Sequence, residues 1–302
     1  MLAPIVLFVY NRPNHTKATV EALAKNTLAK ESELYIFADG PKEKKSNDNI
    51  EKTRDYIKGV QEKYWFKNIV ISLEEQNKGL ANSVIDGVSK IITKHQKIIV
   101  LEDDIVAGPN FLQYMNDALD FYKDNEKIWS ISGYTMNMRS LKKYSECVYF
   151  GYRASSWGWG TWLNRWEKVD WAVKDFETFI LNKKLRKKFN RGGRDMSKML
   201  EEQIKGNIDS WAIRWCYQQS KYDMLTVFPR YSQVKNIGCD GSGTHSGVSS
   251  QFDVQLENSD MDEEFKFIEP YLDKQITKEF YDTLSGALKI RIRNKLKHVF
   301  IK

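Results

Sequence analysis

The sequence predicts an α/β protein with a mostly parallel central sheet flanked by helices. In the first hundred residues, short apolar runs alternate strictly with helix-like stretches, which indicates βαβ units. These runs are mostly apolar on both faces, as expected of strands that helices cover on both sides. The strands are expected at Pro4–Tyr10, Leu34–Ala38, Ile69–Leu73 and Ile98–Leu101, and the helices near His15–Asn26, Asn47–Val60 and Leu80–Lys94.

The pattern changes after Asp104. A helix is expected near Phe111–Tyr122 and short strands near Trp129–Gly133 and Val148–Phe150, followed by a segment rich in Trp and Gly and by several charged helices. The second half is therefore expected to be α+β, built onto the same sheet.

The chain shows no repeat and no long Gly/Ser/Pro linker, so we expect one compact domain over residues 1–256. Residues 1–104 would form its first half and residues 105–256 its second half. Residues 257–302 are expected to form a helical tail that begins acidic and ends basic. That tail fits two interpretations, a segment lying on an anionic membrane surface or an ordinary surface helix.

Composition narrows the class only broadly. The chain has 302 residues, 41% of them hydrophobic, which is enough for a sizeable core. Its net charge of +7 suits nucleic acid, an anionic membrane or a phosphorylated substrate without choosing among them. The three cysteines form no CxxC pair, no apolar run approaches the ~20 residues of a membrane span, and no signal-peptide pattern is present. A cytoplasmic protein without structural disulfides or zinc is expected.

Three consecutive carboxylates, Glu102, Asp103 and Asp104, follow the predicted strand Ile98–Leu101. Such a strand end opens onto the crevice where ligands bind in open α/β sheets. Adjacent anions repel one another unless a cation or hydrogen-bond donors compensate, so the cluster favours Mg²⁺ or Mn²⁺. The alternative is a solvated turn that caps the next helix, for which one Asp would suffice.

This triplet resembles the acidic motif of A-type glycosyltransferases, especially the EDD variant of N-acetylglucosaminyltransferase I. The first strand, with Phe8-Val9-Tyr10-Asn11-Arg12-Pro13, resembles the donor-binding start of bacterial surface-polysaccharide transferases of the family 2 type. The resemblance implies a GT-A (Rossmann-like) nucleotide-diphospho-sugar transferase fold, with Asp104 as metal ligand and Glu102 and Asp103 beside the donor. It also places Tyr10 and Arg12 at the nucleotide, and it implies that residues 1–104 are the nucleotide-sugar-binding half and residues 105–256 the acceptor and catalytic half. An Arg at a strand-to-helix turn can itself fork onto phosphate oxygens, although a surface ion pair explains it equally well.

Two further segments extend the resemblance to the donor site. Asp39 ends the second strand and is placed by the family pattern near the base or ribose, whereas a turn-forming Asp-Gly is the alternative. Gly79 and Leu80 belong to Asn77-Lys78-Gly79-Leu80-Ala81, which resembles the NxGLA element that such enzymes bring close to the donor. A plain helix-start turn explains this segment too.

A segment with four tryptophans, Ser155–Trp166, resembles the WGW-type acceptor loop of the same families. Carbohydrates stack on exposed aromatic faces, but tryptophans at helical spacing more often pack a core. We therefore expect Trp157 and Trp159 to contact the acceptor, and Trp162 and Trp166 to be structural.

Two later residues complete the expected site. Asp209 lies in a segment similar to the one that carries the catalytic base of N-acetylglucosaminyltransferase I, although Ser210 separates it from Trp211; a helix N-cap is the alternative. His245 follows a glycine-rich stretch that resembles a loop closing over the donor, where it would bind the metal or diphosphate. An ordinary exposed His is the alternative.

Together these motifs imply a glycosyltransferase that uses a nucleotide-diphosphate-sugar, with UDP favoured, and Mn²⁺ or Mg²⁺. Its acceptor would be a saccharide or lipid-linked saccharide, in capsule or lipopolysaccharide synthesis at the inner face of the membrane, and inversion is implied by the resemblance alone. A sugar-phosphate nucleotidyltransferase is an alternative, but no GxGxR-type loop follows the first strand. A non-catalytic module for anionic glycans or nucleic acid is another; the acidic strand ends and the lack of a basic-aromatic RNA motif argue against nucleic acid.

Overall fold

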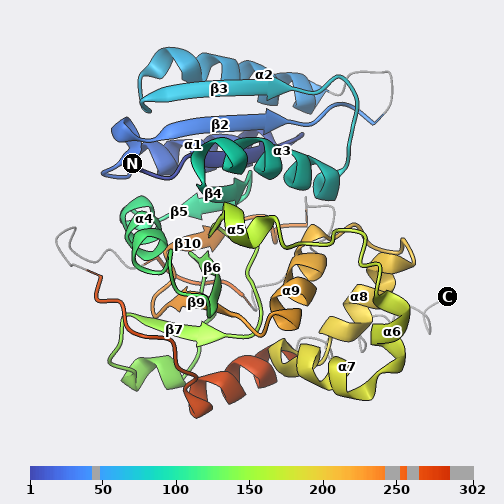
Figure 1. Ribbon diagram of the computed structural model, residues 1–302. Coiled ribbons are helices and arrows are strands. Elements are labelled where there is room, and N and C mark those ends of the chain that lie inside the picture. Colours follow the sequence, from blue (N-terminus) through green and yellow to red (C-terminus); the bar gives the residue numbers. More distant parts are fainter. Residues whose placement is uncertain (43–47, 242–251, 257–264, 286–302) are drawn as a thin grey trace, which may run out of the picture.

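The computed structural model describes residues 1–42, 48–241, 252–256 and 265–285. An eight-stranded sheet runs through them in the order β3-β2-β1-β4-β8-β6-β9-β7 (Figure 1). Its strands are β1 (Ile5–Val9), β2 (Glu33–Ala38), β3 (Asn68–Leu73), β4 (Lys97–Glu102), β6 (Ile128–Ser132), β7 (Val148–Gly151), β8 (Trp159–Trp162) and β9 (Leu225–Pro229). Strands β5 (Ile105–Ala107) and β10 (Val234–Asn236) form a separate antiparallel pair.

The predicted mostly parallel sheet is confirmed. β3, β2, β1 and β4 are parallel to one another, as are β6 and β9, whereas β8 runs antiparallel to both β4 and β6, and β7 runs antiparallel to β9. The helices are α1 (Pro13–Ala24), α2 (Asp48–Val60), α3 (Leu80–His95), α4 (Phe111–Phe121), α5 (Leu163–Trp166), α6 (Phe176–Leu181), α7 (Lys183–Phe189), α8 (Met196–Ile204) and α9 (Trp211–Lys221). The Rossmann-like class expected from the sequence therefore holds.

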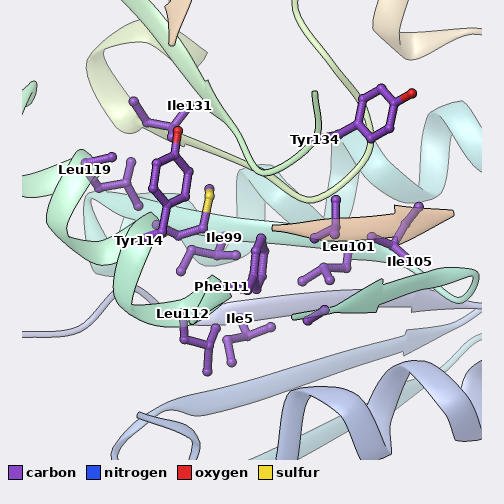
Figure 2. Close-up of a cluster of buried hydrophobic side chains, with 14 of the residues drawn as sticks. Ile5, Ile99, Leu101, Ile105, Phe111, Leu112, Tyr114, Leu119, Ile131 and Tyr134 are labelled. Carbon is purple, nitrogen blue, oxygen red and sulfur yellow. The ribbon is translucent and has the colours of Figure 1, made fainter. Parts of the chain in front are cut away.

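Strand β1 shows why its whole run is apolar. Successive side chains of a strand point to opposite faces of the sheet. Ile5, Leu7 and Val9 join the core beneath α1, α2 and α4, whereas Val6 and Phe8 join the core beneath α3. Figure 2 shows the first of these cores, where Phe111 and Leu112 of α4 lie against Ile5, Ile99 and Leu101.

The Trp- and Gly-rich segment differs from its expected form. Residues 159–162 are not part of a loop but form β8, a central strand paired with β4 and β6. Gly160 fits there because a Cβ at this position would lie 2.9 Å from the carbonyl oxygen of Ile98. Glycine permits the backbone of β8 to approach β4 that closely.

Part of the expected tail packs against the domain. Phe265 and Phe267 contact Tyr114, and Phe280, in a helical stretch at residues 274–285, contacts Phe228 with the ring centroids 5.3 Å apart. Tyr122 donates a hydrogen bond of 2.7 Å to the carbonyl of Ile268. The basic end of the tail lies outside the described residues. Within the described part, no helix is both long and apolar enough to cross a membrane.

Candidate active site

A cavity of about 1010 Å³ opens at the carboxyl ends of β1, β2 and β4. The sheet order reverses between β1 and β4, because β1 is followed by β2 on one side and flanked by β4 on the other. Ligands of open α/β sheets bind at such a switch point. The sequence-predicted residues that line the cavity are Tyr10, Arg12, Asp39, Gly79, Leu80, Glu102, Asp103, Asp104, Trp157 and Asp209.

Arg12 is held against the acidic triplet. Because Phe8 of β1 pairs with Glu102 of β4, the residues that follow these two strands meet across the switch point. The guanidinium of Arg12 pairs with Asp103, and its Nη2 lies 2.9 Å from Oδ2 of Asp104. The alternative of a solvent-exposed surface pair does not apply, since only 16% of the Arg12 side chain is exposed.

One guanidinium does not compensate three carboxylates. The pKa of Glu102 is raised to about 8, chiefly by burial and also by the charges of Asp104 and Asp103, against the opposing effect of Arg12. Burial likewise raises the pKa of Asp103 to about 6, although Arg12 opposes the shift. The carboxylates of Asp103 and Asp104 in turn raise the pKa of Arg12, even though burial lowers it. The cluster therefore favours a further positive charge.

The residues fit a metal ion only in part. Across the described ranges, no three His, Cys, Asp or Glu side chains converge in a way that could hold a metal by themselves. Asp104 borders the cavity but is shared with Arg12, and His245, the second predicted ligand, lies outside the described residues. A cation at Asp104 would need oxygen ligands from a bound phosphate as well, which is usual for Mg²⁺.

The segment after β10 covers the acidic triplet. The amide of Ile237 donates to the carbonyl of Asp104 at 2.9 Å. A Cβ on Gly238 would lie 2.0 Å from Oδ2 of Asp104 and 2.9 Å from Nη1 of Arg12. The backbone at Gly238 therefore rests directly on this ion pair, and any side chain there would displace it.

Asp39 lines the cavity, and its carboxylate is hydrogen-bonded to the neighbouring turn. Its Oδ1 accepts the amides of Gly40 and Lys78, both at 2.9 Å, and its Oδ2 accepts the amide of Gly79 at 3.2 Å and Nδ2 of Asn77 at 2.9 Å. The carboxylate is only 9% exposed. Asp39 thus fixes the turn that carries Gly79, whose φ of 79° favours glycine.

The side chain of Asp209 contacts the first turn of α3, although Asp209 follows Ala81 by 128 residues along the chain. Its Oδ2 accepts the amide of Ala81 at 3.3 Å. Ser210, not Asp209, caps α9, because the Ser210 side chain accepts the amide of Ile213. The N-cap alternative therefore does not account for Asp209, which borders the cavity.

The two acceptor candidates are separated by the fold. Trp157 is half-buried, lines the cavity and packs edge-on against Tyr134, with the ring centroids 4.5 Å apart. Trp159 lies in β8 at 1% exposure, stacked against Trp211 and Trp166. An enclosed ring has no face to offer a sugar, so the prediction for Trp159 is corrected to a core role. Trp162 and Trp166 are buried, as expected.

Sequence reasoning missed most of the wall opposite the acidic triplet. Arg153 lies there, and its Nη1 is 2.8 Å from Oδ1 of Asp195 in a two-pronged ion pair. The apolar lining comes from segments scattered along the chain, namely Tyr134, Met136, Trp157, Phe228, Phe252, Phe280 and Leu284. No local pattern joins these residues, so no sequence signal could have found them together.

Comparison with known proteins adds little. No family model and no curated protein matches the sequence. Among solved structures, residues 1–349 of S. aureus TarS match with a TM-score of 0.46 and 13% identity, covering 78% of this chain and 59% of that one. A structure of S. aureus TarS matches with 0.35 and 13%, covering 53% and 28%. A cytidylyltransferase from Leptospira borgpetersenii serovar Hardjo-bovis (strain JB197) matches with 0.35 and 12%, covering 56% and 64%.

This chain thus spans less than two thirds of each of these structures. TM-scores this low support no argument about function. The fold class rests on the sheet itself, and the function must be argued from the cavity.

Proposed function

We propose that this chain is a metal-dependent glycosyltransferase that moves a hexosyl or N-acetylhexosaminyl group from a nucleotide-diphosphate-sugar, with UDP favoured, to a saccharide hydroxyl. One observation carries the proposal: a single cavity brings a guanidinium and an acidic triplet together with a separate carboxylate, Asp209, and an aromatic face, Trp157. The guanidinium and the acidic triplet suit a diphosphate with its cation. Asp209 and Trp157 suit a sugar whose hydroxyl must lose a proton.

In this proposal Arg12 binds the donor phosphates, and the turn fixed by Asp39 brings the backbone of Gly79 and Leu80 to the donor. Tyr10 lines the nucleotide end of the cavity. Mn²⁺ or Mg²⁺ would be held by Asp104 and by donor oxygens, where it would supply neutralisation of the leaving diphosphate.

Asp209 accepts the proton of the acceptor hydroxyl in this scheme. The hydroxyl oxygen forms its bond to the anomeric carbon as the bond to the diphosphate oxygen breaks, so the nucleoside diphosphate leaves with the electron pair. Attack opposite the leaving group inverts the anomeric configuration. Trp157 offers a ring against which the acceptor sugar stacks. We place this reaction in bacterial surface polysaccharide synthesis, in the cytoplasm, with a saccharide or lipid-linked saccharide as acceptor.

Calorimetric titration of UDP and GDP, with and without Mn²⁺, tests the donor half. We expect metal-dependent binding of UDP to the unsubstituted protein and its loss in Asp104→Asn. Asp55→Asn, which removes an exposed carboxylate from α2, is the matched control and should bind normally. Binding that needs no metal, or survives Asp104→Asn, would discard the metal assignment.

Asp209→Asn tests the catalytic half. It should bind UDP as well as the unsubstituted protein but transfer sugar on the order of 10²–10⁴-fold more slowly, the range for loss of a general base. Release of pyrophosphate from UTP and a sugar 1-phosphate, with no nucleoside diphosphate released from the nucleotide-sugar, would establish the nucleotidyltransferase alternative. Nucleotide binding without turnover on any sugar acceptor would point to a non-catalytic module.

A further inference from the structure

A strongly basic surface lies on helices that the proposed chemistry does not use. Residues 183–198 contain eight Lys and Arg but only one acid, Asp195, which is taken by Arg153. Two of the cations, Lys188 and Arg191, pair with Asp223. Lys183, Lys184 and Lys187 are exposed, and within the described ranges they form no ion pair. We call Leu181, Lys183, Lys184, Leu185 and Lys187 the α7 surface.

The α7 surface also presents apolar side chains to solvent. Leu181, the last residue of α6, is 82% exposed, and Leu185 on α7 is 41% exposed. The opposite sides of these helices are firmly anchored: Phe179 and Phe189 are buried, and their rings lie 4.8 and 5.5 Å from that of Tyr217 on α9. The exposed leucines therefore belong to an ordered surface and not to a loose end.

We propose that the α7 surface docks on an anionic phospholipid bilayer. Lysines attract the negative leaflet, while leucines between them insert at the boundary between headgroups and acyl chains. A nucleic acid is the weaker fit, because residues 181–187 contain no aromatic side chain on which a base could stack. This inference does not depend on the chemistry proposed for the cavity.

The position of the α7 surface decides which side of the molecule would face the bilayer. Helices α6, α7 and α8 lie together at the end of the molecule away from α2 and β3 (Figure 1). Met199 of α8 and the neighbouring Asp195 line the cavity. Docking through α7 thus places the bilayer beside the cavity wall that carries Arg153 and Asp195, and it leaves α2 and β3 facing away from the bilayer.

Vesicle co-sedimentation of the full chain tests the proposal, using phosphatidylcholine alone and phosphatidylcholine with about 30% phosphatidylglycerol. We expect binding to the anionic vesicles alone, weakened by salt. The triple variant Lys183→Glu, Lys184→Glu, Lys187→Glu should lower the partition coefficient at least tenfold, since each surface lysine contributes roughly fivefold. The matched control, Lys52→Glu, Lys58→Glu, Lys63→Glu, makes the same charge change on exposed lysines around α2 and should have little effect.

Leu181→Ser separates a bilayer from other polyanions. It keeps every charge, so we expect several-fold weaker vesicle binding but unchanged binding to a polyanion. Vesicle binding that Leu181→Ser leaves intact, together with binding of single-stranded DNA or an anionic polysaccharide that the α7 triple variant loses, would reassign the surface to a polyanion.

Two other outcomes overturn the proposal. Equal losses in the α7 and control triple variants would mean that net charge alone drives binding. Loss in Arg291→Glu, Arg293→Glu, Lys295→Glu while the α7 triple variant still binds would assign the membrane to the chain end. Circular dichroism and urea denaturation of every variant confirm that the fold is intact.

Discussion

The two walls of the cavity differ in chemistry and in origin. The wall at the ends of β1, β2 and β4 is charged, with Arg12, Asp39 and the triplet from Glu102 to Asp104. The opposite wall is largely aromatic and apolar. Its two charged side chains, Arg153 and Asp195, pair with each other, so their charges cancel. A charged ligand such as a diphosphate suits the first wall, and a neutral ring suits the second. The proposed function therefore assigns the donor to the charged wall and the acceptor to the apolar wall.

The largest effect is expected on the charged wall. Arg12→Met leaves three clustered carboxylates without their cation, so the free energy of unfolding should fall by about 3 kcal/mol, and UDP affinity should fall with it. Urea denaturation measures the first and calorimetry the second. Lys17→Met removes an exposed cation from α1, the helix that follows Arg12, and should change stability by less than about 0.5 kcal/mol. Equal effects of the two substitutions would show that Arg12 is an ordinary surface cation.

The pH dependence of stability probes the same wall. The folded protein binds the proton of Glu102 more tightly than the unfolded chain does, because burial raises the pKa of this carboxyl to about 8. Its stabilising contribution is therefore full below the ordinary pKa of a glutamate and is lost as pH rises toward 8. Without added metal, Glu102→Gln should remove a decline on the order of 2 kcal/mol between pH 5 and pH 8. Parallel pH profiles of the two proteins would contradict this.

A smaller effect is expected where the charged wall is held together. Asp39→Asn replaces a carboxylate that accepts four hydrogen bonds by an amide that meets some of those donors with its own N–H groups. Stability should fall by about 1–2 kcal/mol, and the KM for the donor should rise more than kcat falls, because the turn at Gly79 loosens. Steady-state kinetics measure this, with the exposed Asp48→Asn as control. A fall in kcat alone would assign Asp39 to the chemical step.

The smallest effect is expected on the apolar wall. Trp157→Ala should raise the KM for the acceptor about fivefold and leave UDP binding unchanged, since it removes one stacking face of about 1 kcal/mol. Trp159→Ala offers the contrast: it should destabilise the protein by about 3–5 kcal/mol, because it opens a cavity in the core. If Trp157→Ala weakened UDP binding as well, the two walls would not serve separate substrates.

Much of the charged wall was predictable because it is local in sequence. Arg12, Asp39 and Asp104 each lie within three residues of the end of a strand, and parallel strands bring their carboxyl ends to one edge. The local pattern did not predict which partners these side chains bind. Asp39 faces the backbone of Asn77–Gly79, and this depends on a turn that is 38–40 residues away along the chain.

The sequence by itself determined the alternation of strands and helices, and with it the position of the acidic triplet at a strand end. Only the tertiary structure decided that Trp159 is a core residue in β8 while Trp157 lines the cavity, that Asp209 lies at the start of α3, and that residues 265–285 pack on the domain. The physical reason is the range of the interactions. Periodicity records which face of an element is buried, whereas contacts between distant segments depend on how the elements pack together.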